Sequence, residues 1–346
     1  MTMKKVTIRD VADYVGLSRQ TVSRVLNDSP DITADTRAKV LKAIETLKYR
    51  PALAPDKGLL TRTFVIGVVI PFDNDYLYSD AHLLQVIRGI NREITIHNNS
   101  MLLSTATSSK DRLAAYNRLL KTRLVDGVIV EGGLGDEGVQ LLVDKGYPVV
   151  MTGYNEAGIP CVRPNDEDGA YNLTQHLGAL GHRRIGVIGG PTEAHLPNNA
   201  RLKGYERALH DIGLSFDPAL YIESNYTAES GYHGAPKLMS LPNPPTAIFA
   251  FGDELASGAM RWLQENGFQV PKDVSVAGFN DTPSAALFSP PLTSVHIFSS
   301  DLGQRAARRL FDLMEDRDQA EQEIVLPTQL IVRSSTGIAP HRNHES

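Results

Sequence analysis

The sequence predicts an α/β protein with an N-terminal head of three helices and a body of two doubly wound α/β lobes. Residues 6–27 have the pattern of two short helices joined by a tight turn. From residue 64 onward, continuous apolar strand-like segments alternate with amphipathic helical segments. This alternation is typical of parallel sheets that helices cover on both faces. It continues for too long to form one sheet of ordinary size, so we expect two lobes.

The first two helices have a helix-turn-helix pattern. Thr7 caps the first helix, and Gly16 stands at the turn because glycine adopts positive φ at little cost. Ser18 caps the second helix. The inward apolar positions are Val11, Ala12, Val22, Val25 and Leu26. The second helix projects a polar face of Arg19, Gln20, Ser23 and Arg24. A helix of this size and polarity fits the major groove, so the segment predicts DNA binding.

A third helix follows, with Thr33 as its cap. Its apolar residues share one face: Val40, Ile44 and Leu47. Pro51 ends the head, because a proline disfavours the helical conformation of the preceding residue. We therefore expect a DNA-binding domain over residues 1–51 and a hinge or linker over residues 52–63.

In the body, the expected strands are 64–70, 101–106, 127–130, 148–151, 184–188, 247–251 and 274–279. The expected helices lie around 81–97, 109–122, 137–145, 168–180, 198–212, 229–240 and 254–266. Ligands in such folds bind at the carboxyl ends of the strands. Many of these strands end in Gly, Asp, Asn or Pro, so we expect the ligand site there.

Charge is distributed unevenly along the chain. Residues 1–60 contain 11 Lys/Arg and 7 Asp/Glu, whereas the remaining residues contain 24 and 33. A basic head on an acidic body fits a head that contacts phosphate. The single Cys161 excludes an intramolecular disulfide and is expected to be a small buried hydrophobe in a reducing cytoplasm. No signal-peptide pattern or apolar run of about 18 residues occurs, so we expect no membrane span.

Enzyme motifs are not found in the sequence. It contains no Gly-x-Ser-x-Gly, no Gly-x-x-x-x-Gly-Lys-Ser/Thr, and no Gly-x-Gly-x-x-Gly after a strand. The ten histidines show no metal-ligand spacing. We therefore expect neither catalysis nor a cofactor or metal site.

With these pieces identified, the chain resembles the lactose-repressor (LacI/GalR) family of bacterial transcription regulators over residues 6 to about 337. The resemblance is most specific over residues 7–12 and 18–27. Shorter matches follow at Thr36-Arg37, Tyr49-Arg50-Pro51, Ile66-Gly67-Val68, Leu180-Gly181-His182, Arg201-Leu202-Lys203-Gly204, Ser230-Gly231-Tyr232 and Pro291-Leu292-Thr293-Ser294.

The resemblance implies an allosteric repressor with a periplasmic-binding-protein-like body that dimerises. Two heads would then read a palindromic operator, while a small molecule in the cleft between the lobes alters DNA affinity. A sugar or polyol is the first expectation for this effector. The implied body spans residues 64–340, with lobe 1 at about 64–163 and 294–325, lobe 2 at about 164–291 and 326–340, and a tail at 341–346. The tail has no leucine heptad, so a coiled-coil tetramer is not expected.

By position, three residues of the second helix match base readers: Arg19, Gln20 and Arg24. Arginine suits guanine and glutamine suits adenine, each through paired hydrogen bonds. The other implied DNA-binding residues position phosphates or cap helices: Thr7, Ser18, Thr21, Ser23, Asn27 and Tyr49.

In the implied effector cleft, Arg201 matches the family's arginine and Tyr226 matches an aromatic that stacks on the effector. A surface salt bridge and simple packing are the alternatives for these two residues. The remaining candidates are Asp80, His82, Asp168, Asp253 and Asn280. A solvated loop is the alternative for the first two of these, and helix capping is the alternative for Asp168.

The sequence departs from the family's pattern at several positions. Asn280 replaces the strand-end aspartate, Gly252 precedes Asp253 where Asn-Asp is frequent, and the first loop lacks Asn-Pro-Phe-Phe. Family members also fold a hinge helix on DNA whose leucine wedges into the minor groove. Here Gly58 occupies the leucine position and Pro55 lies within the segment, so we expect less bending of the operator.

Two other functions remain open at this point. The body alone would suit a solute-binding protein for transport or chemotaxis, although the helix-turn-helix argues against that function. The departures at Gly252 and Asn280 also allow a regulator that a protein co-repressor controls instead of a small molecule.

Overall fold

The computed structural model describes residues 8–26, 29, 31–47, 63–71, 80–106, 111–122, 124–131, 137–154, 158–191, 196–315 and 322–340. The chain divides into two compact units, Met1–Thr63 and Phe64–Ser346, and each is described by itself. The predicted capping and contact residues Thr7, Asn27 and Tyr49 lie outside the described residues, as do Pro55 and Gly58 of the linker.

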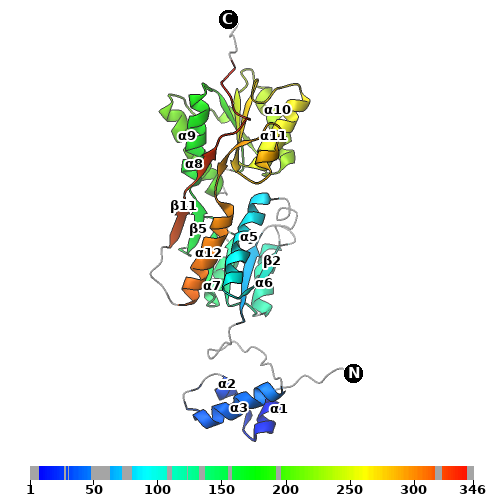
Figure 1. The fold of residues 1–346 in the computed structure, drawn as a ribbon, viewed down its shortest axis with the longest axis vertical. Coiled ribbons are helices and arrows are strands. Elements are labelled where there is room, and N and C mark those ends of the chain that lie inside the picture. The colour runs from blue at the N-terminus through cyan, green and yellow to red at the C-terminus, as the bar shows by residue number, and fades with distance from the viewer. Residues whose placement is uncertain are drawn as a thin grey trace. The chain divides into compact units, whose positions relative to one another are not determined.

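The first unit contains three helices, α1 (Ile8–Val15), α2 (Arg19–Leu26) and α3 (Ala34–Leu47) (Figure 1). Their buried residues form one small core: Val11, Ala12, Val22, Val25, Val40 and Ala43. Thr33 caps α3, since its hydroxyl oxygen accepts from the backbone N–H of Thr36 at 3.3 Å. The apolar spacing in the sequence therefore produces the predicted three-helix head.

The second unit is built on two six-stranded sheets. The first sheet has the order β11-β5-β4-β3-β1-β2, and every neighbouring pair in it is parallel. Its strands are β1 (Val65–Ile70), β2 (Ser100–Thr105), β3 (Gly127–Glu131), β4 (Val149–Thr152), β5 (Cys161–Pro164) and β11 (Glu323–Leu326). The central strands are buried on both faces, which explains their continuous apolar sequences. Cys161 is buried in β5, as predicted.

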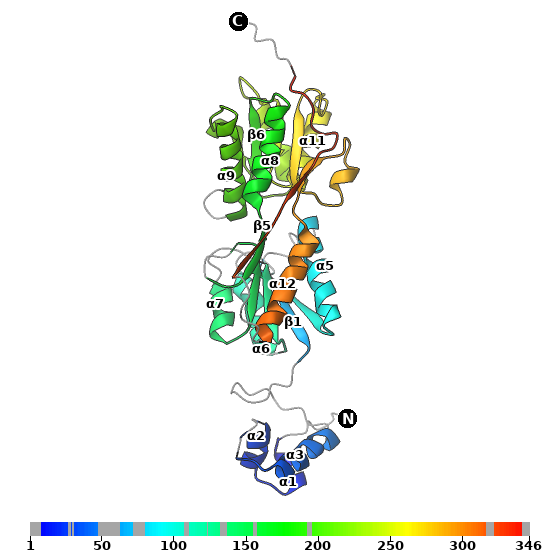
Figure 2. The same ribbon diagram turned by 60° about the vertical axis from the view of Figure 1, so that its left-hand side comes forward.

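The second sheet has the order β12-β10-β9-β8-β6-β7. Its strands are β6 (Ile185–Gly189), β7 (Tyr221–Glu223), β8 (Ala247–Ala250), β9 (Ser275–Asn280), β10 (Thr293–His296) and β12 (Gln329–Ile331). All neighbours are parallel except β12, which runs antiparallel to β10 at the edge. Each sheet with its helices forms one lobe of the body (Figure 2).

Helices cover both sheets. In the first lobe they are α5 (Ala81–Ile96), α6 (Arg112–Thr122), α7 (Glu137–Asp144) and α12 (Ser299–Met314). In the second they are α8 (Asp166–Ala179), α9 (Leu196–Asp211), α10 (Ala228–Met239) and α11 (Asp253–Glu265), with short 3₁₀ turns at Pro218–Leu220 and Ala285–Leu287. Helices α5 and α12 approach so closely that a Cβ on Gly89 would lie 1.9 Å from the carbonyl oxygen of Ser300 (Figure 1). Glycine is therefore required at that crossing.

The chain passes between the lobes after β5, after β10 and after β11. The predicted lobe boundaries are wrong at a few residues. Residues 294–296 were expected in lobe 1 but belong to β10 in the second sheet, and residues 164 and 326 were expected in lobe 2 but belong to β5 and β11 in the first sheet. Strand pairing assigns β10 to the second sheet, because β10 pairs with β9 from Thr293 to His296 and with β12 on its other side. The second segment of the first lobe therefore begins with α12. Each of the seven strands and seven helices predicted for the body coincides with an observed element.

Candidate functional site

The turn between α1 and α2 depends on Gly16. Its φ of +68° is in the left-handed region, and the N–H of Leu17 donates to the carbonyl of Ala12 at 3.0 Å. No atom would clash with a Cβ at Gly16, so the requirement for glycine comes from backbone conformation alone. This turn sets the direction in which α2 leaves α1.

Ser18 begins the second helix as a cap. Its hydroxyl oxygen accepts from the N–H of Thr21 at 3.0 Å, and the two hydroxyls lie 2.9 Å apart. This geometry gives Ser18 and Thr21 a structural role, which is one of the two roles that the sequence implied for them. The N-terminal end of α2 is thereby fixed.

The outer face of α2 carries the predicted base readers. Arg19 and Gln20 are exposed in its first turn, and Ser23 is half-buried. Arg24 is also exposed, but it forms an ion pair with Asp31 at 2.8 Å. Both partners are more than half exposed, so the pair is weak and leaves the guanidinium accessible. This face carries guanidinium donors and an amide, which are the groups that proteins use to read base edges in a major groove.

In the second unit, Arg201 lies at the centre of a buried arrangement. Its Nε donates to Asp166 at 2.7 Å, and the two residues are 7% and 1% exposed. Another guanidinium nitrogen donates to the carbonyl of Phe251, and the guanidinium carbon lies 4.0 Å from the ring centroid of Phe279. Burial lowers the pKa of Arg201, but Asp166, Tyr226 and Tyr154 together outweigh that effect and raise it. The arginine is therefore held charged and in a fixed orientation.

His82 reaches this arrangement from the first lobe. Asp80 caps α5, since its carboxylate accepts from the N–H groups of His82 and Leu83 at 2.8 and 3.2 Å. Nδ1 of His82 lies 2.7 Å from the hydroxyl of Ser299. Burial lowers the pKa of His82; Asp80 opposes this change and Arg201 adds to it. The charge of Arg201 therefore acts on His82 across the two lobes, without a hydrogen bond between them.

Two further carboxylates lie here that the sequence did not identify. Glu131 ends β3 and accepts from the hydroxyl of Thr152; burial raises its pKa to about 7, and nearby Asp80 adds to the increase. Glu254, in the first turn of α11, also has a raised pKa, through burial and then Asp80. In the sequence, Glu131 and Glu254 could have been found because each lies at, or shortly after, the carboxyl end of a parallel strand, where ligand sites are expected. We call the following residues the inter-lobe cluster: Asp80, His82, Glu131, Asp166, Arg201 and Glu254.

Tyr226 lies beside this cluster in a left-handed conformation, with φ of +65°. Its hydroxyl donates to the side-chain oxygen of Asn198 at 3.1 Å. Burial raises the pKa of Tyr226, and Arg201 is close enough to oppose that change. The ring is half-buried, so the geometry is compatible with both packing and stacking on a ligand.

Three predicted effector residues lie in different surroundings. The carboxylate of buried Asp253 accepts from Ser294 at 2.6 Å and from the N–H and hydroxyl of Thr282 at 2.6 and 3.0 Å, so both of its oxygens are occupied. Asp168 is exposed and pairs with Arg207 at 2.8 Å. The structure thus places Asp166, not Asp168, against Arg201, because α8 begins after Asn165 and turns only its first aspartate inward.

Asn280 ends β9 with φ of +103°. Its side-chain oxygen is buried and has no hydrogen-bond partner among the described residues. An acceptor left in this state gains a partner when a donor-bearing molecule binds next to it. Asn280 therefore remains a candidate contact.

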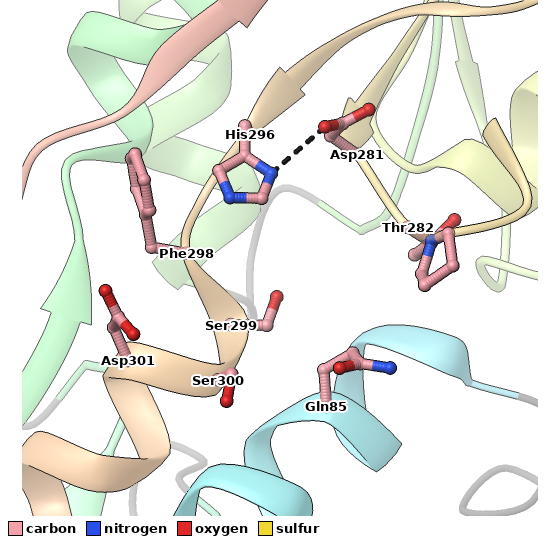
Figure 3. Close-up of a pocket in the computed structure, with 9 residues that line it drawn as sticks. Gln85, Asp281, Thr282, His296, Phe298, Ser299, Ser300 and Asp301 are labelled. Atoms are coloured by element: carbon pink, nitrogen blue, oxygen red, sulfur yellow. Dashed lines mark hydrogen bonds and ion pairs between the residues drawn. The ribbon is translucent and has the colours of Figure 1, made fainter. Parts of the chain in front are cut away.

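A separate cavity of about 160 Å³ lies where β10 leads into α12 (Figure 3). Its wall includes Gln85, Asp281, His296, Phe298 and Ser299. Nδ1 of His296 lies 3.0 Å from Asp281, as the dashed line shows. The cavity is smaller than typical ligand pockets, and Ser299 links it to His82.

Two kinds of feature are not found among the described residues. No group of three or more His, Cys, Asp or Glu in this part of the chain is arranged to hold a metal ion. No described helix is both long and apolar enough to cross a membrane.

Comparison with known proteins gave matches along nearly the whole chain. Residues 7–52 match the model of bacterial regulatory proteins of the lacI family, and residues 174–336 match a periplasmic binding protein-like domain. Catabolite control protein A of Priestia megaterium is 34% identical over 336 residues, which cover 96% of this chain and 99% of that protein.

Two solved structures are similar over the same span. A complex of the transcriptional regulator CelR with cellobiose has a TM-score of 0.73 and 30% identity, covering 96% of this chain and all of that one. The lac repressor dimer bound to operator and the anti-inducer ONPF has a TM-score of 0.70 and 30% identity with the same coverage. The predicted fold class is thereby confirmed: a helix-turn-helix head and a periplasmic-binding-protein-like body.

Proposed function

Because the chain belongs to the lacI family of bacterial regulatory proteins, we propose that it is a repressor that binds a palindromic operator as a dimer and responds to a sugar or polyol bound between its lobes. It acts in the cytoplasm, without catalysis, cofactor or metal. The observation that carries the proposal is the Arg201–Asp166 pair, which is buried in the second lobe and interacts with His82 of the first. A ligand at this position contacts both lobes and therefore favours one arrangement of them over another.

The effector contacts divide by lobe. Asp80 and His82 contribute from the first lobe, and Arg201, Tyr226 and Asn280 from the second. Arg201 binds paired hydroxyls or a carboxylate through its planar fork. Asp253 and Asp168 do not contact the effector: Asp253 holds the loop that follows β9, and exposed Asp168 pairs with Arg207 at the surface.

On DNA, Arg19, Gln20 and Arg24 contact base edges from the exposed face of α2. The remaining contacts fix the head on phosphates: Thr7, Ser18, Thr21, Ser23, Asn27 and Tyr49. One head offers too few contacts for a specific site, so two act together. The lac repressor structure, which is a dimer bound to operator, supports this arrangement.

A sugar is the preferred effector class because the CelR structure contains cellobiose in a chain of the same fold. The sequence departures at Asn280 and Gly252 prevent transfer of any particular sugar. Thermal unfolding of the full chain against sugars and polyols identifies the class. A ligand at about 100 times its Kd stabilises the folded state by about 2.7 kcal/mol.

The deciding experiment uses an operator selected from random DNA and the ligand found by thermal unfolding. We expect Arg201→Ala to abolish the ligand's effect on DNA binding while DNA binding itself remains. If the alanine variant is unstable, Arg201→Lys replaces it in this experiment, because lysine keeps the positive charge beside Asp166 but lacks the planar guanidinium group. Arg207→Ala is the matched control, since Arg207 lies on the same helix with exposed ion pairs. A ligand response that persists without Arg201 rejects the site.

A further inference from the structure

We propose that Tyr154 and Asp166 bind one hydroxyl group of the effector between them. The phenol of Tyr154 donates a hydrogen bond to that hydroxyl, and the second carboxylate oxygen of Asp166 accepts one from it. This inference rests on the proposed function, because it names a further contact for the same ligand. It adds Tyr154 to the effector site and requires a ligand group that accepts and donates at once.

Tyr154 lies where the first lobe leads into the second. It follows β4, and the N–H of Gly153 donates to the carbonyl of Val162 in β5 at 2.8 Å. The guanidinium carbon of Arg163, also in β5, lies 4.7 Å from the centroid of the Tyr154 ring. Strand β5 ends two residues before Asp166, which is the first residue of α8 in the second lobe. The pairing of β4 with β5 therefore brings Tyr154 to the start of α8.

Two buried polar atoms at this junction have no hydrogen-bond partner among the described residues. They are the hydroxyl of Tyr154 and one carboxylate oxygen of Asp166. The other oxygen of Asp166 accepts from Nε of Arg201 at 2.7 Å, so the carboxylate cannot turn without breaking that pair. Buried polar groups in folded proteins are normally paired, so these two atoms indicate a bound group that satisfies both.

The two side chains are close to each other but are not hydrogen-bonded. Burial raises the pKa of Tyr154, and the charge of Asp166 adds to that increase. The phenol therefore stays protonated and is available as a donor. No hydrogen bond joins it to Asp166, although both atoms are buried. A group that lies against both side chains would complete the arrangement.

A donor and an acceptor together select the chemistry of that group. A hydroxyl accepts from the phenol and donates to the carboxylate, so it matches both atoms. A ligand carboxylate has no hydrogen to donate to Asp166, and an ammonium group has no lone pair to accept from Tyr154. Sugars and polyols carry hydroxyl groups on neighbouring carbons, so one can lie here while another reaches Arg201.

The same hydroxyl gives the ligand a means of acting on the lobes. Tyr154 belongs to the first lobe, and Asp166 belongs to the second. An arrangement of the lobes that separates the two side chains loses one of the two hydrogen bonds. The ligand therefore favours the arrangement that keeps both, which is the differential interaction that shifts a conformational equilibrium.

The first test compares two variants of the full-length protein without ligand. Tyr154→Phe removes an unpartnered donor and keeps the ring beside Arg163, so we expect the midpoint of thermal unfolding to stay constant or rise. Tyr205→Phe is the matched control, because the hydroxyl of buried Tyr205 donates to the carbonyl of Ile185 at 2.8 Å; here we expect the midpoint to fall. An equal fall in Tyr154→Phe shows that its hydroxyl is already bonded in the free protein, which overturns the proposal.

The second test measures binding of four probes by calorimetry: D-glucose, D-galactose, D-ribose and D-glucitol. For a probe that binds the wild type, we expect Tyr154→Phe to weaken binding by about three- to tenfold, which corresponds to one lost hydrogen bond, and Tyr205→Phe to leave it unchanged. Monodeoxy derivatives of that probe then locate the hydroxyl. One derivative should bind the wild type at least as weakly as the parent probe binds Tyr154→Phe, and Tyr154→Phe should weaken that derivative no further.

The possible outcomes separate this inference from the proposed function. A probe that binds Tyr154→Phe as tightly as the wild type, but loses affinity in Arg201→Lys, overturns the role of Tyr154 and leaves the proposed function standing. If Tyr154→Phe weakens every monodeoxy derivative equally, the phenol does not contact one hydroxyl, and the proposal is again overturned. No binding of any probe to the wild type counts against both the bridging hydroxyl and the sugar or polyol effector.

Discussion

Arg201 of α9 and Asp166 of α8 form an ion pair of 2.7 Å in which both side chains are almost completely buried. The pair joins the first turn of α8 to a helix of the same lobe and leaves one carboxylate oxygen unpartnered among the described residues. Loss of either partner would therefore leave the other as an uncompensated buried charge.

The first prediction concerns the stability of this pair. Arg201→Ala leaves Asp166 as an uncompensated buried charge, so we expect the free energy of unfolding to fall by about 3–5 kcal/mol at neutral pH. Arg207→Ala removes ion pairs whose partners are about half exposed, and we expect a loss below about 1 kcal/mol. Urea unfolding measures both. If Arg201→Ala costs no more than Arg207→Ala, the pair is not a buried interaction in solution.

The second prediction concerns operator preference. We expect Gln20→Ala to change the preferred operator sequence and to weaken binding of the original site by about 1–3 kcal/mol, because an exposed glutamine in the first turn of α2 reads a base through two hydrogen bonds. Selection from random DNA measures the preference. Lys39→Ala is the control, since Lys39 is exposed on α3 and pairs with Asp35. A Gln20→Ala variant that selects the wild-type consensus excludes Gln20 as a base reader.

The third prediction is a pH dependence from Asp253. Burial raises its pKa from 3.8 to about 7, against the hydrogen bonds from Ser294 and Thr282. The folded state therefore binds a proton at Asp253 more tightly than the unfolded state does. The stabilisation of the folded state that results is complete below about pH 4 and is lost as the pH rises to about 7. The loss is steepest at about 1.4 kcal/mol per pH unit.

We therefore expect Asp253→Asn, which keeps the shape and a neutral side chain, to be more stable relative to the wild type at pH values above about 7 than near pH 4. Chemical unfolding over this range measures the difference. Asp168→Asn provides a comparison at an exposed carboxylate. Parallel pH profiles for the wild type and Asp253→Asn would show that Asp253 does not titrate in this range.

The fourth prediction concerns the linker. Pro55 lacks a backbone donor and Gly58 costs about 1 kcal/mol relative to alanine in a helix, and no leucine occupies the position of the family's wedge. We expect little bending at the operator centre, measured by the gel mobility of circularly permuted sites. Gly58→Leu should increase the bend if the wedge position is otherwise intact. A strong central kink with the wild-type protein contradicts the prediction.

Much of the fold could be predicted because the dominant elements carry their own signal. Buried parallel strands such as β1 are continuous apolar runs, and the helices between them have one apolar face. The predicted elements did not include β5, β7, β10, β11 and β12, which are three or four residues long. Strands β4 and β8 are equally short but were predicted, because all of their residues are buried, whereas each strand that was missed contains at least one residue that is not. Helix α12 is different: its sequence has the helical pattern, and the prediction omitted it.

The site was predicted less completely. Residues 165–168 contain three acidic side chains, and only the packing of α8 on α9 selects Asp166 as the partner of Arg201. Asp253 stands at the carboxyl end of a strand like a ligand-binding residue, but the loop after β9 folds over it and occupies both of its oxygens. Glu131 and Glu254 join the cluster only because the carboxyl ends of two separate sheets face each other.

The sequence by itself determined the family, the three-helix head and the alternation of strands and helices, because these depend on caps, turn residues and apolar spacing between near neighbours. The tertiary structure alone decided which charged groups meet. Asp80 lies 174 positions before Glu254 in the chain, yet it adds, from the other lobe, to the increase that burial causes in the pKa of that carboxyl. Electrostatic interactions depend on distance in space and on burial, and neither is encoded in the spacing of residues along the chain.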